Sequence, residues 1–520
     1  MARPAVAAAK GPDNIELSGL PMILAVFTLA FANFMVVLDM TIANVSVPHI
    51  AGSLAVSPSQ GTWVITSYAV AEAVAVPLTG WLTARIGAVR LFLLSIIGFA
   101  LASLLCAWSS SLAMLIAARI LQGLCGGPIM PLSQTLLLSS YPPGKTGPAL
   151  AAWAMTTLLA PIAGPLLGGW ISDNLAWQWI FYINLPVALL CTSLVFGIYA
   201  SRETAIVKAP IDLVGLVLLV IWVGALQLIL DKGRELDWFG SPVIVTLAAV
   251  AAVGFAVFII WELTDAHPVV ELRIFANRNF TAGVLSLSLI FGVFFGYIVL
   301  FPLWLQAYEG YTALSAGMAI APMGILSILM APVVGLNLNR VDPRWFATFA
   351  VAVFAGVFLW RSTVTPSPTF GSIVGPQFVI GLGLSTMFLP LTALALSEIK
   401  PAQMAAAAGL QNFARTLLGA FGTALATSYW EDGISRHHAE LTESVTQASG
   451  AARHFSALAA QAVGSRMGGS ALIDRIIETQ AAVMSLRDFF VLAAVGVLLT
   501  TPLIWLARRT ANSVDVSQVH

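Results

Sequence analysis

The sequence predicts an all-α integral membrane protein. Hydrophobic residues make up 59% of the chain and charged residues 9%, and the mean hydropathy is +0.91. These are too few charges to cover the surface of a soluble protein. The apolar residues gather in segments of roughly 20 residues, the length that an α-helix needs to cross a bilayer. We place fourteen such segments, and an even number puts both termini on one side.

The expected spans follow one another in a six-plus-two-plus-six arrangement. Six fill residues 20–200 as an N-terminal six-helix bundle, two inserted spans with polar linkers fill residues 201–279, and six more form a second bundle within residues 280–520. The spans are expected to begin near Leu20, Thr62, Val89, Leu112, Ala149, Trp179, Ile211, Pro242, Phe280, Ala313, Arg344, Ser372, Ala402 and Leu486.

The charges of the loops predict the orientation. Lys and Arg gather in alternate loops and in the two tails, residues 1–19 and 508–520, whereas the opposite short loops hold only Lys232, Arg234 and Arg361. Short loops rich in Lys and Arg stay in the cytoplasm. Both termini are therefore expected to be cytoplasmic, with the first span kept as an uncleaved anchor.

A non-membrane segment, residues 431–485, separates the last two expected spans on the outer side. It mixes charged residues, histidines and alanines, and we interpret it as a periplasmic helical hairpin. Two roles remain open: a tolerated surface insertion, since long loops often do little, or a docking surface for a partner protein.

Composition also excludes several classes of function. The three cysteines lie in expected spans, which suggests neither a disulfide framework nor a metal site. A formal net charge of zero predicts no nucleic-acid partner. No catalytic, metal or phosphate-binding constellation stands out, so we expect no cofactor and no enzyme activity.

Three ionisable residues within the N-terminal spans are candidates for proton coupling, because a charge at membrane depth is costly. Asp39 lies deep in the first span, and a carboxyl removed from water can take up and release a proton. Alternatively, it is a structural carboxylate bonded to Thr41, Asn44 or a facing Arg. Glu72, in the second span, is either a second proton carrier or a group that binds cationic drugs.

Arg119 is the third candidate. Arg119, Gln122, Gly123, Gly126 and Gly127 recur at helical spacing, so they share one face that must look into protein. The guanidinium would favour loss of a proton from a nearby carboxyl. The alternative is a purely structural ion pair with Asp39.

The substrate cavity is expected between the two bundles, near the midplane. Arg415 either binds the anionic form of a lipophilic acid or pairs across the bundle interface, and Gln411 and Asn412 share its helical turn. Aromatic and flexible apolar side chains would form an adaptable lining for lipophilic compounds, although for any one of them ordinary packing is the commoner role. These side chains are Phe34, Met35, Trp153, Phe294, Tyr297, Met387 and Phe388.

Four motifs, in the right order, carry a resemblance to one transporter family. The fifth span holds Gly164-Pro165-x-x-Gly168-Gly169, similar to the antiporter signature of the major facilitator superfamily, and the fourth holds Arg119-x-x-Gln122-Gly123. The stretches Leu38-Asp39-x-Thr41-Ile42-x-Asn44-Val45 and Trp177-x-Trp179-Ile180-Phe181-x-Ile183-Asn184-x-Pro186 resemble elements of its fourteen-helix drug:proton antiporters.

The loop after the second span resembles the cytoplasmic gate motif of the same superfamily. Gly80, Arg85, Gly87 and Arg90 match the motif, but Ala84 stands at the position of its usual Asp. The departure puts the gate's charge relay in doubt, so another acid must hold the gate or it is held loosely.

The resemblance extends over nearly the whole chain to the EmrB-type pumps of the fourteen-helix branch (DHA2). It implies a major facilitator fold in the bacterial inner membrane and rocker-switch exchange of lipophilic drugs for protons. It also implies a periplasmic adaptor of the EmrA type and an outer-membrane channel of the TolC type as partners. The remaining alternative is a proton-coupled symporter, or an exporter of one metabolite that works without such partners.

Overall fold

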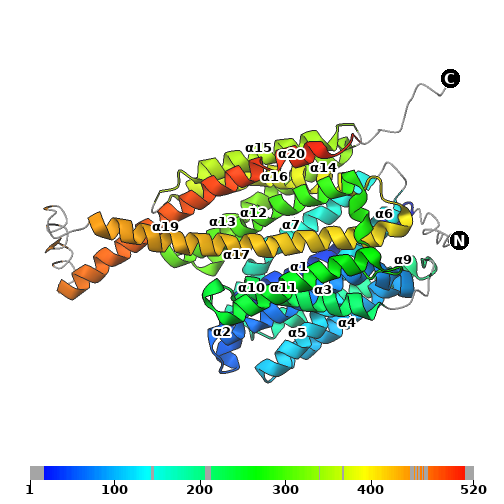
Figure 1. Cartoon of the computed structure of the whole chain (residues 1–520), viewed down its shortest axis with the longest axis horizontal. Helices are drawn as coiled ribbons and strands as arrows, with labels where there is room; N and C mark the ends of the chain where they lie inside the picture. The colour runs from blue at the N-terminus through cyan, green and yellow to red at the C-terminus, as the bar shows by residue number, and fades with distance from the viewer. Residues whose placement is uncertain are drawn as a thin grey trace.

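Helices are the only regular secondary structure in the described chain. The computed structural model describes residues 17–141, 146–204, 212–338, 340–365, 368–444 and 466–509, with the single residues 206, 450, 454, 457, 458 and 461. No strand occurs within these residues, which confirms the all-α prediction for them. In chain order the elements are α1 (Leu20–Ser53), α2 (Pro58–Gly61), α3 (Trp63–Ile86), α4 (Ala88–Ala107), α5 (Leu112–Gly126), α6 (Ile129–Ser140), α7 (Thr146–Asn174), α8 (Trp179–Tyr182), α9 (Asn184–Tyr199), α10 (Leu213–Lys232), η1 (Trp238–Gly240), α11 (Pro242–Thr264), η2 (Leu272–Ala276), α12 (Arg278–Tyr308), α13 (Ala313–Ile320), α14 (Pro322–Asn337), α15 (Pro343–Arg361), α16 (Phe370–Leu396), η3 (Pro401–Gln403), α17 (Met404–Ser444), α19 (Arg466–Leu498) and α20 (Thr501–Leu506) (Figure 1).

Most of these helices are long and apolar enough to cross a membrane. Among the described residues 12 helical stretches meet this description, and four of them join two labelled helices: α5 with α6, α8 with α9, α13 with α14, and α19 with α20. Helix α7 makes 13 if its two bent parts form one span. Those parts meet at 41°, directly after Pro161. The 41-residue α17 is not among these spans, so a total of fourteen stays a prediction.

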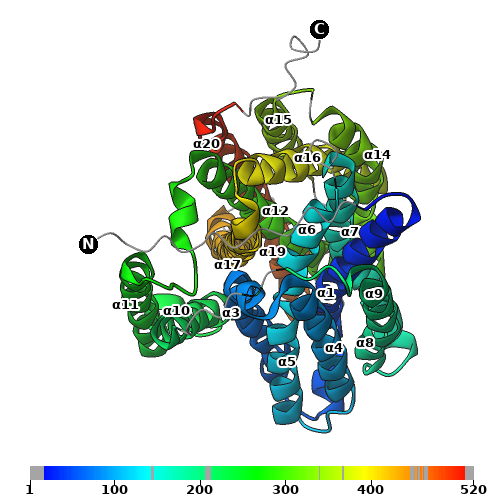
Figure 2. The same ribbon diagram turned by 90° about the vertical axis from the view of Figure 1, so that its right-hand side faces the viewer.

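The helices form two groups with a pair at their side. In the N-terminal group α1 packs on α7 and α9, and α3 packs on α5. In the C-terminal group α12 packs on α16 and α17, and α15 packs on α16 and α19. The inserted pair, α10 and α11, lies beside the N-terminal group, where α10 contacts α3 and α17 (Figure 2). The predicted domain boundaries are compatible with this grouping and remain predictions.

Small residues bring the two groups into close contact at the end of the bundle where the described chain begins and ends (Figure 1). A Cβ atom on Gly80 of α3 would lie 2.7 Å from Cα of Ala406 in α17. One turn further on, a Cβ on Gly409 would lie 3.0 Å from the carbonyl oxygen of Val76. The backbones of α3 and α17 therefore touch, as small residues permit in membrane helices.

Glycine also sets the distance between α12 and α17 within the C-terminal group. A Cβ on Gly422 would overlap the carbonyl group of Gly292, and one on Gly296 would lie 2.8 Å from Cβ of Ala426. A side chain larger than hydrogen therefore has no room at position 422.

Helices α17 and α19 continue together past the other helices, at the end opposite the described termini (Figure 1). They are joined where Trp430 Nε1 donates to the Ala482 carbonyl (3.1 Å) and Ser485 Oγ donates to the Trp430 carbonyl (2.6 Å). The last span was expected to begin near Leu486, but the helix is continuous from Arg466. The described ends of the expected hairpin, residues 431–444 and 466–485, are therefore continuous with α17 and α19, and most of residues 445–465 lie outside the described part.

One histidine links α17 to α19 through an ion pair when its imidazole is protonated. His437 of α17 contacts Glu440 Oε2 through Nδ1 (2.9 Å) and Asp488 Oδ2 of α19 through Nε2 (2.8 Å), and Arg436 also pairs with Asp488 (3.4 Å). Partial burial of the imidazole lowers the pKa of His437, but the Asp488 and Glu440 carboxylates raise it by more. The pKa of His437 therefore lies above its ordinary value.

We expect Gly422→Ala to destabilise the protein by about 1–3 kcal/mol, the usual cost of overpacking a tight contact. The added methyl group must push α12 and α17 apart. Thermal unfolding of the purified protein in detergent would measure the change. Gly197→Ala is the matched control, because a Cβ there meets nothing within 4 Å. Equal melting temperatures for the two variants would contradict the packing argument.

We expect His437 to stabilise the α17–α19 extension in a pH-dependent way. Because its pKa is raised on folding, the stabilisation is full below the unfolded pKa of about 6.5 and is lost as the pH rises through the folded value. It should be about 1 kcal/mol or less, because the Glu440 and Asp488 carboxylates are exposed to water, which weakens such ion pairs. The melting temperature of His437→Gln should therefore fall below that of the parent at pH 5 and approach it at pH 8. With His267→Gln as control, a difference independent of pH would contradict the assignment.

Candidate substrate and proton-coupling site

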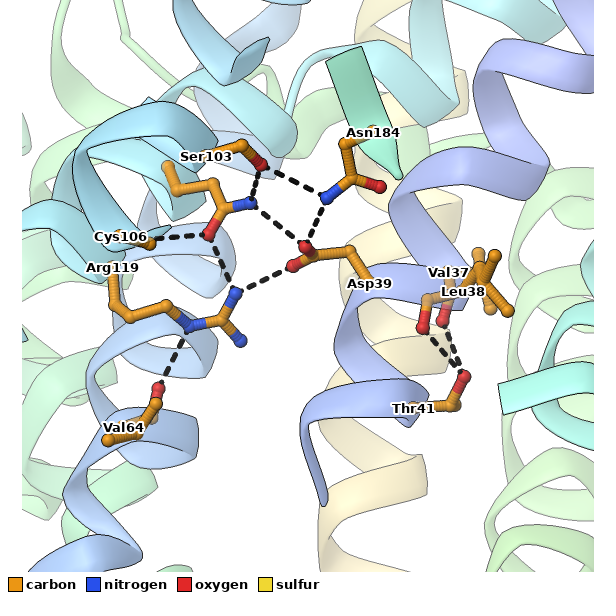
Figure 3. A network of polar contacts seen from close by, with 10 residues as sticks. Val37, Leu38, Asp39, Thr41, Val64, Ser103, Cys106, Arg119 and Asn184 are labelled. Atoms are coloured by element: carbon orange, nitrogen blue, oxygen red, sulfur yellow. Dashed lines mark hydrogen bonds and ion pairs between the residues drawn. The ribbon is translucent and has the colours of Figure 1, made fainter. Parts of the chain in front are cut away.

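Asp39 and Arg119 form a buried ion pair inside the N-terminal group. Nη1 of Arg119, on α5, donates to Oδ2 of Asp39, on α1, at 2.6 Å (Figure 3). Arg119 Nε donates to the carbonyl oxygen of Val64 on α3 at 3.1 Å. Asp39 and Arg119 are 1% and 0% exposed. One guanidinium therefore holds α1, α3 and α5 together.

Three neutral side chains complete the network around this pair. Oδ1 of Asp39 accepts from Asn184 Nδ2 at 2.6 Å and from Gln122 Nε2 at 3.0 Å. Both amides also donate to Ser103 Oγ, at 3.0 and 2.7 Å, and Figure 3 shows the serine between them. The carboxylate is thus surrounded by donors, which a buried charge requires.

Aromatic rings close the network from other sides. The guanidinium of Arg119 lies 4.3 Å from the centre of the Tyr68 ring and 5.6 Å from that of Phe181. Of the partners that the sequence left open for Asp39, the structure selects the facing Arg. Thr41 instead donates to the carbonyl groups of Val37 and Leu38, and Asn44 lines a cavity.

Glu72 has a different environment from Asp39. It lies on α3, is 7% exposed, and lines a cavity of about 340 Å³ between the two helix groups. Among the described residues no side chain forms a direct hydrogen bond or ion pair with its carboxyl group. Of the two predicted carboxyl groups, Glu72 therefore faces the cavity, while Asp39 is sealed by its network.

The cavity wall is largely apolar and aromatic, with a few polar groups. Its lining comes from α1, α3, α6, α7, α10, α12 and α17. The apolar part includes Met40, Ile65, Met130, Phe291 and Phe295. Thioether and aromatic side chains adapt to ligands of different shape.

Arg415 faces the same cavity from α17. It is 3% exposed, and its guanidinium lies 5.0 Å from the centre of the Phe291 ring and 5.3 Å from that of Phe388. Nη2 contacts Sδ of Met130 (2.6 Å), whereas Nε and Nη1 are buried without a hydrogen-bond partner. No described carboxylate forms an ion pair with it, so these donors are free for a ligand.

The other predicted cavity residues lie elsewhere in this conformation. Phe34 and Met35 line a separate groove of about 330 Å³ beside Asn184. The remaining ones are buried within the helix packing and do not line the central cavity: Trp153, Phe294, Tyr297, Met387, Phe388, Gln411 and Asn412. Helical periodicity cannot tell the side of a helix that faces a cavity from the side that packs on a neighbour.

A wider vestibule of about 830 Å³ continues the cavity toward the end opposite the termini. Asn44, Ile65 and Asp231 line both spaces. Four of the charged side chains around the vestibule form two ion pairs. Lys232 contacts Glu235 (2.6 Å), and Arg234 pairs with Glu431 of α17.

The antiporter motif packs α7 on α1. A Cβ on Gly164 would overlap the Thr41 side chain, and one on Gly168 would lie 2.9 Å from the carbonyl oxygen of Ile42. Gly169 meets nothing within 4 Å, and Pro165 lies in the part of α7 that follows the bend. The motif therefore lies directly behind the helix that carries Asp39.

At the predicted cytoplasmic gate, where Ala84 replaces the usual Asp, a different acid lies on the loop between α3 and α4. Glu203 accepts from the backbone N–H of Val89 (3.0 Å) and of Arg90 (2.9 Å), at the start of α4. It also lies 3.8 Å from Nε of Arg90 and directly over Gly87. Arg85 instead lies over the Trp81 ring at 5.7 Å.

Several of these residues were missed by the sequence analysis. Asn184 was quoted only as part of a motif, and its hydrogen bond to Asp39 was not foreseen. Asp231 lies at the end of an expected span, and no local pattern singles it out. Glu203 lies in a polar linker, where acids are common. Among the described residues no group of three or more possible metal ligands occurs.

Comparisons with known proteins agree with this architecture. The model of the Major Facilitator Superfamily matches residues 29–423. The chain is 46% identical to the multidrug export protein EmrB of Escherichia coli (strain K12), over 95% of this chain and 96% of that protein. It is 43% identical to the fatty acid resistance protein FarB of Neisseria gonorrhoeae, over 96% and 99% of the two chains.

A solved structure agrees in fold alone. The human organic anion transporter MFSD10 (TETRAN) superposes with a TM-score of 0.57 at 13% identity, covering 94% of this chain and 100% of that one. The expectation of a transporter with a major facilitator fold is therefore confirmed, and the chain belongs to the Major Facilitator Superfamily, within which it is an EmrB-type transporter.

Proposed function

We propose that the protein is a proton-driven exporter of lipophilic compounds that works by alternating access in the bacterial inner membrane, with both termini in the cytoplasm. The central cavity is the main observation that supports this proposal. Its wall is mostly apolar, and it holds Glu72 and Arg415 without ion-pair partners among the described residues. Relatives that are named for multidrug export and for fatty acid resistance support this proposal.

The conformation corresponds to an outward-facing state in this proposal. Helices α3 and α17 touch around Gly80 and Ala406, at the end of the bundle where the described chain begins and ends. The vestibule lies at the opposite end, beside Glu431. A substrate that reaches the cavity from the cytoplasm would leave through the vestibule after the two groups rock about the central contacts.

Proton coupling is assigned to Asp39 of α1, with Glu72 of α3 as a second candidate carrier. Glu72 lies on this helix and faces the cavity, so protons reach it from the outer side. Asp39 is tied to the same helix through Arg119 and the Val64 carbonyl. Protonation of Asp39 would remove the charge that Arg119 neutralises and so loosen α1 from α3 and α5, which links proton uptake to helix movement.

Glu203 is proposed to replace the missing acid of the cytoplasmic gate. Its carboxylate caps the first turn of α4, where the helix dipole favours a negative charge. The cap fixes the loop between α3 and α4, and α3 is the helix that contacts α17. In this way Glu203 would hold the cytoplasmic end closed in the outward-facing state.

The extension formed by α17 and α19 is proposed to face a periplasmic adaptor of the EmrA type, which would connect the pump to an outer-membrane channel of the TolC type. The position of the extension supports this proposal. It projects on the side opposite the described termini, beside the mouth of the vestibule (Figure 1). Substrates leaving the vestibule would pass directly along it.

We expect Asp39→Asn to abolish proton movement driven by lipophilic compounds. Purified protein in liposomes with an imposed pH gradient, and a lumenal pH dye, would report collapse of the gradient when a compound is added. The variant should behave like protein-free liposomes. Because an unpaired buried Arg119 costs about 3–5 kcal/mol, the double variant Asp39→Asn/Arg119→Gln tests coupling with both charges removed.

Glu72→Gln separates the two roles that remain for Glu72. Loss of proton movement with unchanged compound binding would make it a proton carrier, and loss of cation binding alone would make it a binding residue. Normal exchange by a folded Asp39→Asn protein would overturn the assignment of Asp39. Coupled uptake of a single metabolite, in place of exchange, would favour a symporter.

We expect Glu203→Gln to loosen the cytoplasmic closure, because the cap of α4 loses its charge. Spin labels at Ala84→Cys and Lys400→Cys, in a background without the native cysteines, would measure the distance between the ends of α3 and α17 by pulsed electron resonance. The variant should add a population at longer distance, and Glu443→Gln in the outer extension should not. An unchanged distribution would show that Glu203 does not hold the gate.

A further inference from the structure

One of the two inserted helices contributes directly to the central cavity. The last turns of α10 bring Gln227, Leu230 and Asp231 into its lining, although α10 lies outside the two six-helix groups. The contact is made because α10 packs on both α3 and α17, the helices that carry Glu72 and Arg415. The inserted pair is therefore part of the cavity wall.

Asp231 is a carboxylate without a cation. Its side chain is exposed to the cavity and accepts from Gln227 Nε2 at 3.3 Å. The neighbouring cations are engaged elsewhere, since Lys232 Nζ contacts Glu235 (2.6 Å) and Thr62 (2.8 Å), and Arg234 pairs with Glu431. No described Lys or Arg forms an ion pair with Asp231.

The cavity holds two acids and one base, on three helices that pack against one another. Glu72 of α3 and Asp231 of α10 lie on neighbouring helices, whereas Arg415 comes from α17. Glu72 is more than nine-tenths buried, has no direct partner among the described residues, and faces the same space. The aromatic faces of Phe291 and Phe295 line it as well, and such faces also attract cations.

We propose that Asp231 forms, with Glu72, a subsite for the positively charged group of a lipophilic organic cation. Gln227 orients the carboxylate, and the apolar wall takes up the rest of the molecule. The proposal rests on the proposed export function and names one class of substrate for it. Because Asp231 lines both cavity and vestibule, the bound cation would lie on the outward path.

The test compares two ions of equal shape and opposite charge. Tetraphenylphosphonium and tetraphenylborate are titrated onto the purified full-length protein by calorimetry, with the parent and with Asp231→Asn. We expect Asp231→Asn to weaken tetraphenylphosphonium binding on the order of tenfold, since one contact between opposite charges is lost. Binding of tetraphenylborate should not weaken.

Two variants control the comparison. Asp237→Asn removes the same charge from the loop after α10 but lies outside both the cavity and the vestibule, so it should bind both ions as the parent does. Asp231→Glu keeps the charge and should retain most of the cation affinity. Melting temperatures establish that all three variants fold.

The outcomes separate this inference from the function on which it rests. If Asp231→Asn loses affinity equally for both ions, Asp231 is a structural residue. If the variant binds the cation as the parent does but no longer couples transport to protons, Asp231 is a proton carrier. Either result overturns the subsite. If the parent exchanges other lipophilic compounds for protons but does not bind tetraphenylphosphonium, the subsite fails and the export function stands. If the parent exchanges no compound at all, the export function itself fails.

Discussion

The cost of placing a charge inside a membrane organises this protein. A charged side chain inside the membrane is costly unless it faces away from lipid. Five such side chains turn inward and lie in two environments. Asp39 and Arg119 are sealed in a network in which the carboxylate is surrounded by donors. Glu72, Asp231 and Arg415 instead face a cavity. The first environment holds three helices together, and the second leaves charges free for a ligand.

Close helix packing makes both environments possible. In lipid there is little hydrophobic force between helices, so small residues and interhelical hydrogen bonds must hold them together. Gly164 and Gly168 bring α7 against the helix that carries Asp39, and Gly123 brings α5 against the backbone of Tyr68, close to Glu72. A shift of any of these helices would therefore move a charge as well as an apolar surface. This physical link is what a coupled transporter needs.

The inserted helices belong to the same design. Their presence was foreseen from hydropathy, but their position beside α3 and α17 was not. Asp231 enters the cavity only because α10 packs there, and Arg234, in the loop after α10, reaches across to Glu431. Two helices that lie outside the two six-helix groups thus add an acid to the cavity wall and a contact at its mouth.

Sequence alone determined the all-α membrane class, the approximate places of the spans and the family, because hydropathy and short motifs are local properties of the chain. It also placed Asp39, Glu72, Arg119 and Arg415 inside the membrane, since their flanking residues are apolar. Only the tertiary structure decided which of them meet. The pairing of Asp39 with Arg119 and Asn184, the sealing of that pair, the exposure of Glu72 to the cavity and the approach of Glu203 to α4 all join residues far apart in the chain. The side of each helix that meets a neighbour depends on the packing of all the others, and no local pattern encodes it.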